Sequence, residues 1–171
     1  MRIVLDTNVL LSGLARADRP PGKILSAWRK GQFDLVVSEP MIEEVLRVFH
    51  YPKVRRMLAD AEVTYEDLRE ITEMLRLKAV VVDVTGVALK TVPRDPKDVL
   101  VMATLIASEA EWLVTGDKRD LLSLGLRNIV TARDFLSRID ALRLPPLAEQ
   151  PRAAYRVARG RRRRPASTAL A

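Results

Sequence analysis

Acidic side chains directly follow two apolar segments of this sequence. Asp6 closes the run Arg2–Leu5, and Asp117 follows Trp112–Thr115 after a single glycine. Continuous apolar runs of this kind are predicted strands, and the carboxyl ends of parallel strands meet at one edge of a sheet, where binding sites form. Each acid taken alone also fits a turn or a helix N-cap. A site is therefore indicated only if further acids are expected at the same edge.

Asp98 lies at the start of a helical segment that is apolar on nearly every side. The preceding Asp95-Pro96 pair is typical of a helix N-cap, and Asp98 fits the capping-box partner of that cap, which is its structural alternative. Helical spacing, however, places Asp98 beside Val101 and Leu105, where a carboxylate is costly to bury. No Lys or Arg occurs in residues 99–115 to neutralise it. A bound cation would stabilise a carboxylate in this position.

A fourth acid is expected from the helical segment over residues 39–50. Glu43 lies four residues before Arg47 on a polar stripe, where the two are expected to pair in solvent. Glu44 lies beside Met41 at the edge of the apolar face. Of the two glutamates, we expect Glu44 to reach a site.

The composition narrows the chemistry that such acids can perform. The 171 residues include no cysteine and one histidine, His50, which excludes thiolate metal sites, multi-histidine zinc sites and RNA cleavage by a histidine pair. Oxygen ligands alone suit Mg²⁺ or Mn²⁺. The joint placement of the acids therefore predicts a divalent-metal site made by Asp6, Glu44, Asp98 and Asp117.

The elements that position these acids follow from the hydrophobic pattern. The expected strands are Arg2–Leu5, Phe33–Val37, Val80–Val84, Trp112–Thr115 and Asn128–Val130. The expected helices are Val9–Ala15, Gly22–Lys30, Glu39–His50, Tyr65–Leu77, Pro96–Glu111 and Arg133–Ile139. Apolar strands that alternate with helices predict an α/β fold, with a central parallel sheet flanked by helices, in a single domain.

The charge of the chain changes towards its C-terminus. The net charge is +7, but residues 151–171 hold seven arginines and no acid, so the first 150 residues carry 22 basic and 22 acidic residues. We expect residues 1–140 to form the folded domain. Residues 141–171 are expected to form a disordered, Pro/Ala/Arg-rich basic tail that either binds RNA or is simply solvated. No apolar run is long enough to span a membrane, and a cytoplasmic location is expected.

Four motifs of the sequence resemble, in order, those of PIN-domain nucleases, especially the VapC-like toxins of bacterial and archaeal toxin–antitoxin pairs. The motifs are Val4-Leu5-Asp6-Thr7-Asn8-Val9, Ser38-Glu39-Pro40-Met41-Ile42-Glu43-Glu44-Val45-Leu46, Asp95-Pro96-Lys97-Asp98 and Val114-Thr115-Gly116-Asp117. The resemblance covers about residues 1–140. It implies a Rossmann-like parallel sheet and metal-dependent hydrolysis of RNA, with Mg²⁺ or Mn²⁺ as the cofactor.

The resemblance also implies a role for individual residues. The positions that match the catalytic, metal-binding acids of the family are Asp6, Glu44, Asp98 and Asp117. Asn8 and Thr115 match positions that support the site by hydrogen bonding, and Asp120 is expected to be accessory.

Binding of RNA requires positive charge, because carboxylates repel phosphate. Lys97, Lys118 and Arg119 lie next to the acids in sequence and are expected either to contact the RNA backbone or to be solvated surface charges. Homodimers are usual in the family, and a toxin would be paired with a small antitoxin protein that covers its site.

Three other functions stay open at the level of sequence. An aspartate-nucleophile phosphatase also carries an acid after its first strand, but it requires a second Asp two residues on, where this sequence has Asn8. A catalytically silent PIN-like domain that binds RNA or a partner protein would not need all four acids. A PIN nuclease of RNA maturation or one that acts on DNA would share every motif, because a fold does not determine its substrate.

Overall fold

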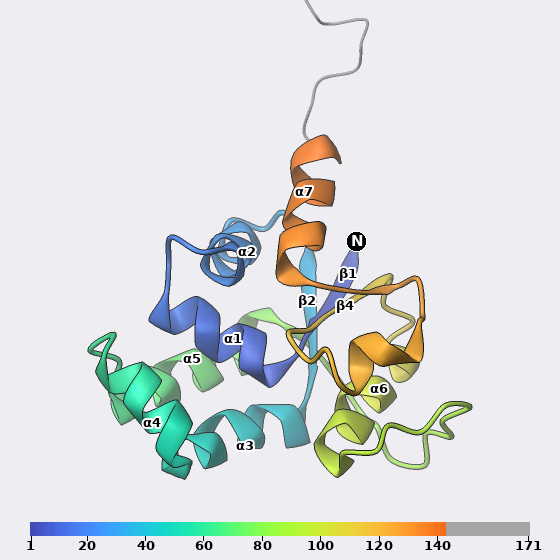
Figure 1. Ribbon diagram of the computed structural model, residues 1–171, viewed down its shortest axis with the longest axis horizontal. Helices are drawn as coiled ribbons and strands as arrows, with labels where there is room; N and C mark the ends of the chain where they lie inside the picture. The colour runs from blue at the N-terminus through green and yellow to red at the C-terminus, as the bar shows by residue number, and fades with distance from the viewer. Residues whose placement is uncertain (143–171) are drawn as a thin grey trace, which may run out of the picture.

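The computed structural model describes residues 1–142 of the chain. Strands and helices alternate along this part of the sequence, and the last helix ends at Leu142 (Figure 1). The basic tail expected over residues 141–171 therefore lies outside the described residues, apart from its first two positions, which belong to that helix.

Five parallel strands form one sheet in the order β3-β2-β1-β4-β5 (Figure 1). The strands are β1 (Arg2–Leu5), β2 (Asp34–Ser38), β3 (Val80–Val82), β4 (Trp112–Val114) and β5 (Ile129–Val130). In the central strand β1, Val4 is paired with Val36 of β2 and with Leu113 of β4. Every expected strand is present, with ends that differ by at most two residues, and the predicted α/β fold is confirmed.

Helices connect the strands. They are α1 (Thr7–Ala15), α2 (Pro20–Arg29), α3 (Glu39–Arg47), α4 (Pro52–Ala59), α5 (Tyr65–Lys78), α6 (Pro96–Ala107) and α7 (Ala132–Leu142), with 3₁₀ turns η1 (Val48–His50) and η2 (Leu121–Leu124). Within residues 1–142, no helix is both long and apolar enough to cross a membrane.

Helix α4 was not expected from the sequence. Pro52 looks like a break after the preceding helix, but proline is favoured at the first position of a new helix, and α4 begins there. The segment expected as one helix over residues 39–50 is α-helical to Arg47 and then tightens into η1. Tyr51 consequently lies at the junction between η1 and α4.

Helix α6 is shorter than expected and ends at Ala107 instead of Glu111. The Ser108 hydroxyl donates a hydrogen bond to the backbone oxygen of Thr104 at 2.7 Å, and Glu109 has a left-handed φ of 51°. These features stop the helix before the chain enters β4.

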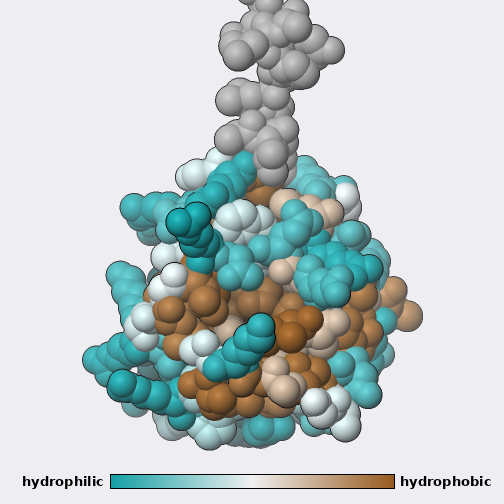
Figure 2. Space-filling model, turned by 90° about the vertical axis from the view of Figure 1, so that its right-hand side faces the viewer, coloured by the Kyte–Doolittle hydropathy of each residue, from teal (hydrophilic) through white to brown (hydrophobic). Residues whose placement is uncertain are grey.

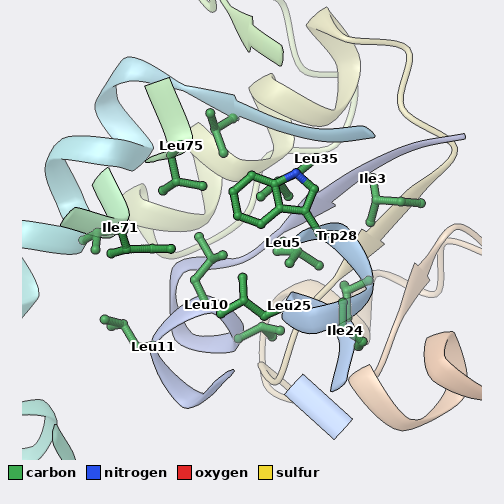
Figure 3. Close-up of a cluster of buried hydrophobic side chains, with 14 of the residues drawn as sticks. Ile3, Leu5, Leu10, Leu11, Ile24, Leu25, Trp28, Leu35, Ile71 and Leu75 are labelled. Carbon is green, nitrogen blue, oxygen red and sulfur yellow. The ribbon is translucent and has the colours of Figure 1, made fainter. Parts of the chain in front are cut away.

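The core lies on both faces of the sheet because successive strand residues point to opposite sides. On one face, Leu5 and Leu35 pack with Trp28 of α2 and with side chains from α1 and α5 (Figure 3). Helix α7 adds Phe135 to the same cluster. On the other face, Val4 packs against Met102 and further apolar residues of α6. The sheet is therefore covered on both sides, and only its edges and strand ends are open for a site.

The first turn of α2 packs closely at Gly22 against the backbone of Arg16 and Ala17, which follow α1. A Cβ atom at this position would lie 2.4 Å from the backbone oxygen of Arg16 and 2.5 Å from the Cα of Ala17, closer than packed atoms allow. The contact holds the start of α2 against the connection that leaves α1, the helix that begins directly after Asp6, and the two helices pack together. The absence of a side chain at Gly22 thus helps to fix the first helix of the site.

We expect Gly22→Ala to lower the free energy of unfolding by about 2 kcal/mol or more, because the clash with backbone exceeds the gain in helix propensity. Urea denaturation measures the change. Ser26→Ala, at an exposed position of the same helix, is the control and should change stability by less than about 0.5 kcal/mol. Equal stability of the two variants would contradict the assigned contact.

Candidate active site

The carboxyl ends of the three middle strands bring the predicted acids to one edge of the sheet. Asp6 follows β1 directly, Glu44 lies on α3, which starts where β2 ends, and Asp117 lies three residues beyond β4. Asp98 comes from the first turn of α6. Four separate elements therefore supply the four acids.

These side chains line one cleft of about 660 Å³. Its lining includes the acids Asp6, Glu44, Asp98 and Asp117 together with Asn8. Apolar residues of α1, α3, α4 and α6 extend the cleft away from the acids, and Arg16, Arg47, Lys53 and Lys97 contribute positive charge. The cleft thus combines an acidic end with a partly apolar, partly cationic continuation.

Asp6 is buried, and its Oδ1 accepts a long hydrogen bond of 3.5 Å from the backbone N–H of Asn8. Its Oδ2 accepts a bond from the Asn8 side-chain amide at 2.7 Å and another from the Thr115 hydroxyl at 2.6 Å. The Thr115 hydroxyl in turn accepts the backbone N–H of Asp117 at 2.9 Å. Burial raises the pKa of Asp6, and the bonds from Thr115 and Asn8 oppose that rise. The orientation of the Asp6 carboxylate is therefore set by both neighbouring residues.

Asp117 and Asp120 shape the loop after β4. The Oδ1 atom of Asp117 accepts the backbone N–H groups of Arg119 at 2.7 Å and Asp120 at 2.9 Å. The buried Asp120 carboxylate accepts the backbone N–H of Asp95 at 2.8 Å. Asp120 consequently joins this loop to the N-terminus of α6, a contact that no spacing in the sequence indicates.

The same bond removes the capping-box alternative for Asp98. Asp95 caps α6 by accepting the backbone N–H of Lys97 at 2.9 Å, but the backbone N–H of Asp95 is taken by Asp120 and not by Asp98. Asp98 is only 7% exposed, and its Oδ2 atom has no hydrogen-bond partner among the described residues. Asp98 is therefore not explained as a helix cap.

The surroundings of Asp98 disfavour the ionised form of its carboxyl group. Burial, followed by the negative charges of Asp6, Asp117, Asp120 and Asp95, raises its pKa from 3.8 to about 7. A buried carboxylate with an unpartnered oxygen, surrounded by other carboxylates, is stabilised by a cation. The chemistry of this donor set fits a hard divalent ion.

Glu44 is buried as well, but it differs from Asp98 because cations of the chain neutralise it. Its Oε2 pairs with Arg47 at 2.8 Å, and its Oε1 lies 3.3 Å from the Lys97 ammonium, close enough for an ion pair although not aligned as a hydrogen bond. The expected pairing of Arg47 with Glu43 is therefore wrong. Arg47 turns towards the buried Glu44 one residue later, where the uncompensated charge is, and Glu43 stays exposed.

The acids do not already form a ligand cluster. Within residues 1–142, no three acidic or histidine side chains are close enough to hold a metal ion as they stand. An ion could bind only if the carboxylates turned towards it, and the predicted metal site stays a prediction.

The cationic residues predicted to contact RNA are placed differently from one another. Lys97 lines the cleft, whereas Lys118 and Arg119 are exposed on the loop beyond Asp117 and are not among its lining residues. Sequence reasoning missed Tyr51, which lines the cleft where η1 meets α4. The signal that could have revealed it is Pro52, read as the start of a helix.

We expect Asp98→Asn to stabilise the metal-free protein in a pH-dependent way. Because the pKa of Asp98 is higher in the folded chain, its ionisation lowers the free energy of unfolding as the pH rises from about 4 to 7. Thermal melts in EDTA should show a Tm gain of about 3–6 °C at about pH 8 and a smaller gain at about pH 5.

The control for this measurement is Glu43→Gln, which neutralises an exposed acid. Added Mn²⁺ should raise the Tm of the wild type and of this control more than that of Asp98→Asn. A Tm gain in Asp98→Asn that is the same at both pH values would show that burial of charge is not its cause.

Comparison with known proteins agrees with the geometry. The PIN domain family matches residues 2–119, more than two thirds of the chain and a range that contains Asp6, Glu44, Asp98 and Asp117. A search of curated proteins finds no match to the chain. PIN domains are typically metal-dependent nucleases. The chain belongs to the PIN domain family.

Proposed function

We propose that this protein is a divalent-metal-dependent endoribonuclease whose active site is the acidic end of the cleft. The observation that carries the proposal is the environment of Asp98, a buried carboxylate with an unpartnered oxygen beside the charges of Asp6 and Asp117. Such an arrangement is unfavourable by itself and becomes favourable when a cation is bound. Membership in the PIN domain family supports nuclease chemistry for that cation.

The residues of the cleft would share the work as follows. Asp6, Asp98 and Asp117 would hold Mg²⁺ or Mn²⁺, with Glu44 as the fourth acid assigned by resemblance. When bound, such an ion supplies positive charge at the scissile phosphate and activates water for attack. Asn8 and Thr115, the two donors to Asp6 Oδ2, would keep that carboxylate oriented.

We further propose that the protein is the toxin of a toxin–antitoxin pair, with RNA as substrate. A small antitoxin would then cover the cleft by placing a basic side chain among the acids. A homodimer is proposed as well, and the face that carries α6 offers apolar surface for one (Figure 2). Exposed apolar residues include Ile106 on α6, Val92 in the segment before α6 and Leu126 in the segment after η2.

A second candidate is a catalytically silent PIN domain that binds RNA or a partner protein. The observation in its favour is that no three side chains within residues 1–142 form a ready metal cluster. The two candidates differ in whether purified protein cleaves RNA, which makes cleavage the deciding measurement.

We expect purified protein to cleave a mixed RNA pool with Mg²⁺ or Mn²⁺ and not in EDTA. Asp6→Asn should reduce the rate by on the order of 100-fold or more, because loss of a ligand should cost more than the roughly 10–100-fold typical of outer-shell partners. The matched control is Glu43→Gln, at an exposed position outside the cleft lining, which should keep the wild-type rate.

Equal cleavage by the wild type in EDTA and by Asp6→Asn would mean that the activity comes from a contaminant or another mechanism. RNA binding without cleavage would favour the silent domain, once mass spectrometry has excluded an antitoxin that co-purifies with the protein.

The product ends provide an independent prediction. The sequence has only one histidine, so a histidine pair cannot activate the RNA 2′-hydroxyl as the nucleophile. Attack by water instead leaves a 5′-phosphate and a 3′-hydroxyl. End mapping of the fragments by mass spectrometry checks this expectation, and fragments with 2′,3′-cyclic phosphate ends would refute the proposed chemistry.

A further inference from the structure

Lys97 is held inside the cleft by residues from two other elements. Its ammonium lies 3.3 Å from Oε1 of Glu44 on α3, and it donates a hydrogen bond to the Tyr51 hydroxyl at 3.2 Å. The same ammonium lies 4.3 Å from the centre of the Tyr51 ring. Lys97 of α6 is therefore oriented by contacts with α3 and with the junction of η1 and α4, and it is not a freely solvated surface charge.

The Lys97 ammonium still has bonding capacity for a ligand. An ammonium has three donors, and the neighbouring protein oxygens, on Glu44 and Tyr51, number two. The side chain is 51% exposed, so a ligand in the cleft can reach it. One donor is thus available beside Asp98, the next residue in the chain, and Glu44, Arg47 and Lys97 together keep one net positive charge.

Glu44 is occupied in a way that separates it from the aspartates. Its two oxygens face two cations of the chain, Arg47 at 2.8 Å and Lys97 at 3.3 Å. Oε1 of Glu44 and Oδ2 of Asp98 both lack a hydrogen-bond partner, but within residues 1–142 only Glu44 has cations at ion-pair distance. A divalent ion would gain little from a carboxylate that is already neutralised and would have to displace these cations to bind it. The two ends of the acid cluster are therefore suited to different ligands.

Tyr51 is fixed in place by its backbone. Its N–H donates to the backbone oxygen of Val48 at 3.0 Å, and its own backbone oxygen accepts the N–H of Arg55 at 2.9 Å. These bonds join η1 to α4 and set the position from which the phenol meets Lys97. The residue itself is 36% exposed and lines the cleft.

We infer that Lys97, positioned by Glu44 and Tyr51, binds a phosphate of the RNA strand beside the acidic cluster, and that Glu44 serves as a positioning residue for this lysine and for Arg47 and not as a metal ligand. The inference rests on the proposed nuclease function and changes the role that family resemblance assigns to Glu44. It places a phosphate-binding subsite between the aspartates and the apolar part of the cleft.

The first test measures RNA binding without cleavage. A fluorescein-labelled single-stranded RNA is titrated with the full chain in EDTA at several salt concentrations. Lys97→Met should weaken binding by about 3–10-fold and reduce the slope of log K against log salt by about 0.7, the value for one lost phosphate contact. Lys97→Arg, which keeps the charge, should restore the slope.

Lys90→Met is the matched control, since Lys90 is exposed and lies outside the residues that line the cleft. Its slope should equal that of the wild type. An unchanged slope in Lys97→Met, or no RNA binding by the wild type, would overturn the phosphate subsite.

The second test measures metal binding without RNA. Free Mn²⁺ is counted by electron paramagnetic resonance during titration of each variant. Glu44→Gln should keep Mn²⁺ affinity within about threefold of the wild type, whereas Asp98→Asn should lose about tenfold or more. Glu43→Gln controls for the loss of one nearby negative charge.

The outcomes separate the inference from the function on which it rests. Equal losses of Mn²⁺ affinity in Glu44→Gln and Asp98→Asn would make Glu44 a metal ligand and overturn its positioning role. A wild type that binds no Mn²⁺ would instead refute the proposed metal-dependent function, whatever the RNA titrations show.

Discussion

Uncompensated negative charge at the carboxyl edge of the parallel sheet is the constraint on which this structure depends. Asp6, Asp98 and Asp117 come together there because β1, β4 and α6 all end or begin at the same edge. The charge of Asp98 is the least favourable of these, since the residue is buried and its Oδ2 atom has no partner among the described residues. Burial of these charges destabilises the folded chain, and a bound cation would offset that destabilisation.

The rest of the local structure keeps the carboxylates in place despite their mutual repulsion. Thr115 and Asn8 both donate to Asp6, and the backbone of the loop after β4 donates to Asp117. Asp120 then ties that loop to the start of α6. These bonds satisfy carboxylate oxygens of Asp6, Asp117 and Asp120 and leave Oδ2 of the buried Asp98 without a partner.

Charge is distributed unevenly along the cleft. Within residues 1–142, the buried carboxylates Asp6 and Asp98 have no ion-pair partner, whereas Glu44 faces both Arg47 and Lys97. A nuclease must attract a cation and a polyanion to adjacent positions, and a uniformly acidic cleft would repel the polyanion. The division seen here supplies both requirements within one cleft of about 660 Å³.

The sequence by itself determined the α/β fold, the strands and the candidate acids, because these depend on hydrophobic periodicity and on which residues follow a strand. It also indicated the burial of Asp98, since helical spacing surrounds that residue with apolar side chains. Tertiary structure alone decided that Arg47 pairs with Glu44 instead of Glu43, and that Asp120 takes the backbone N–H of Asp95.

The contact of Tyr51 with Lys97 was likewise decided only by tertiary structure, because it joins residues 46 positions apart in the chain. The pairing of Glu44 with Lys97 is of the same kind. The physical reason is that burial sets the strength of an electrostatic interaction, and burial depends on how distant segments pack. Spacing along the chain shows which charges are able to meet, but only the packed fold shows which of them are removed from water.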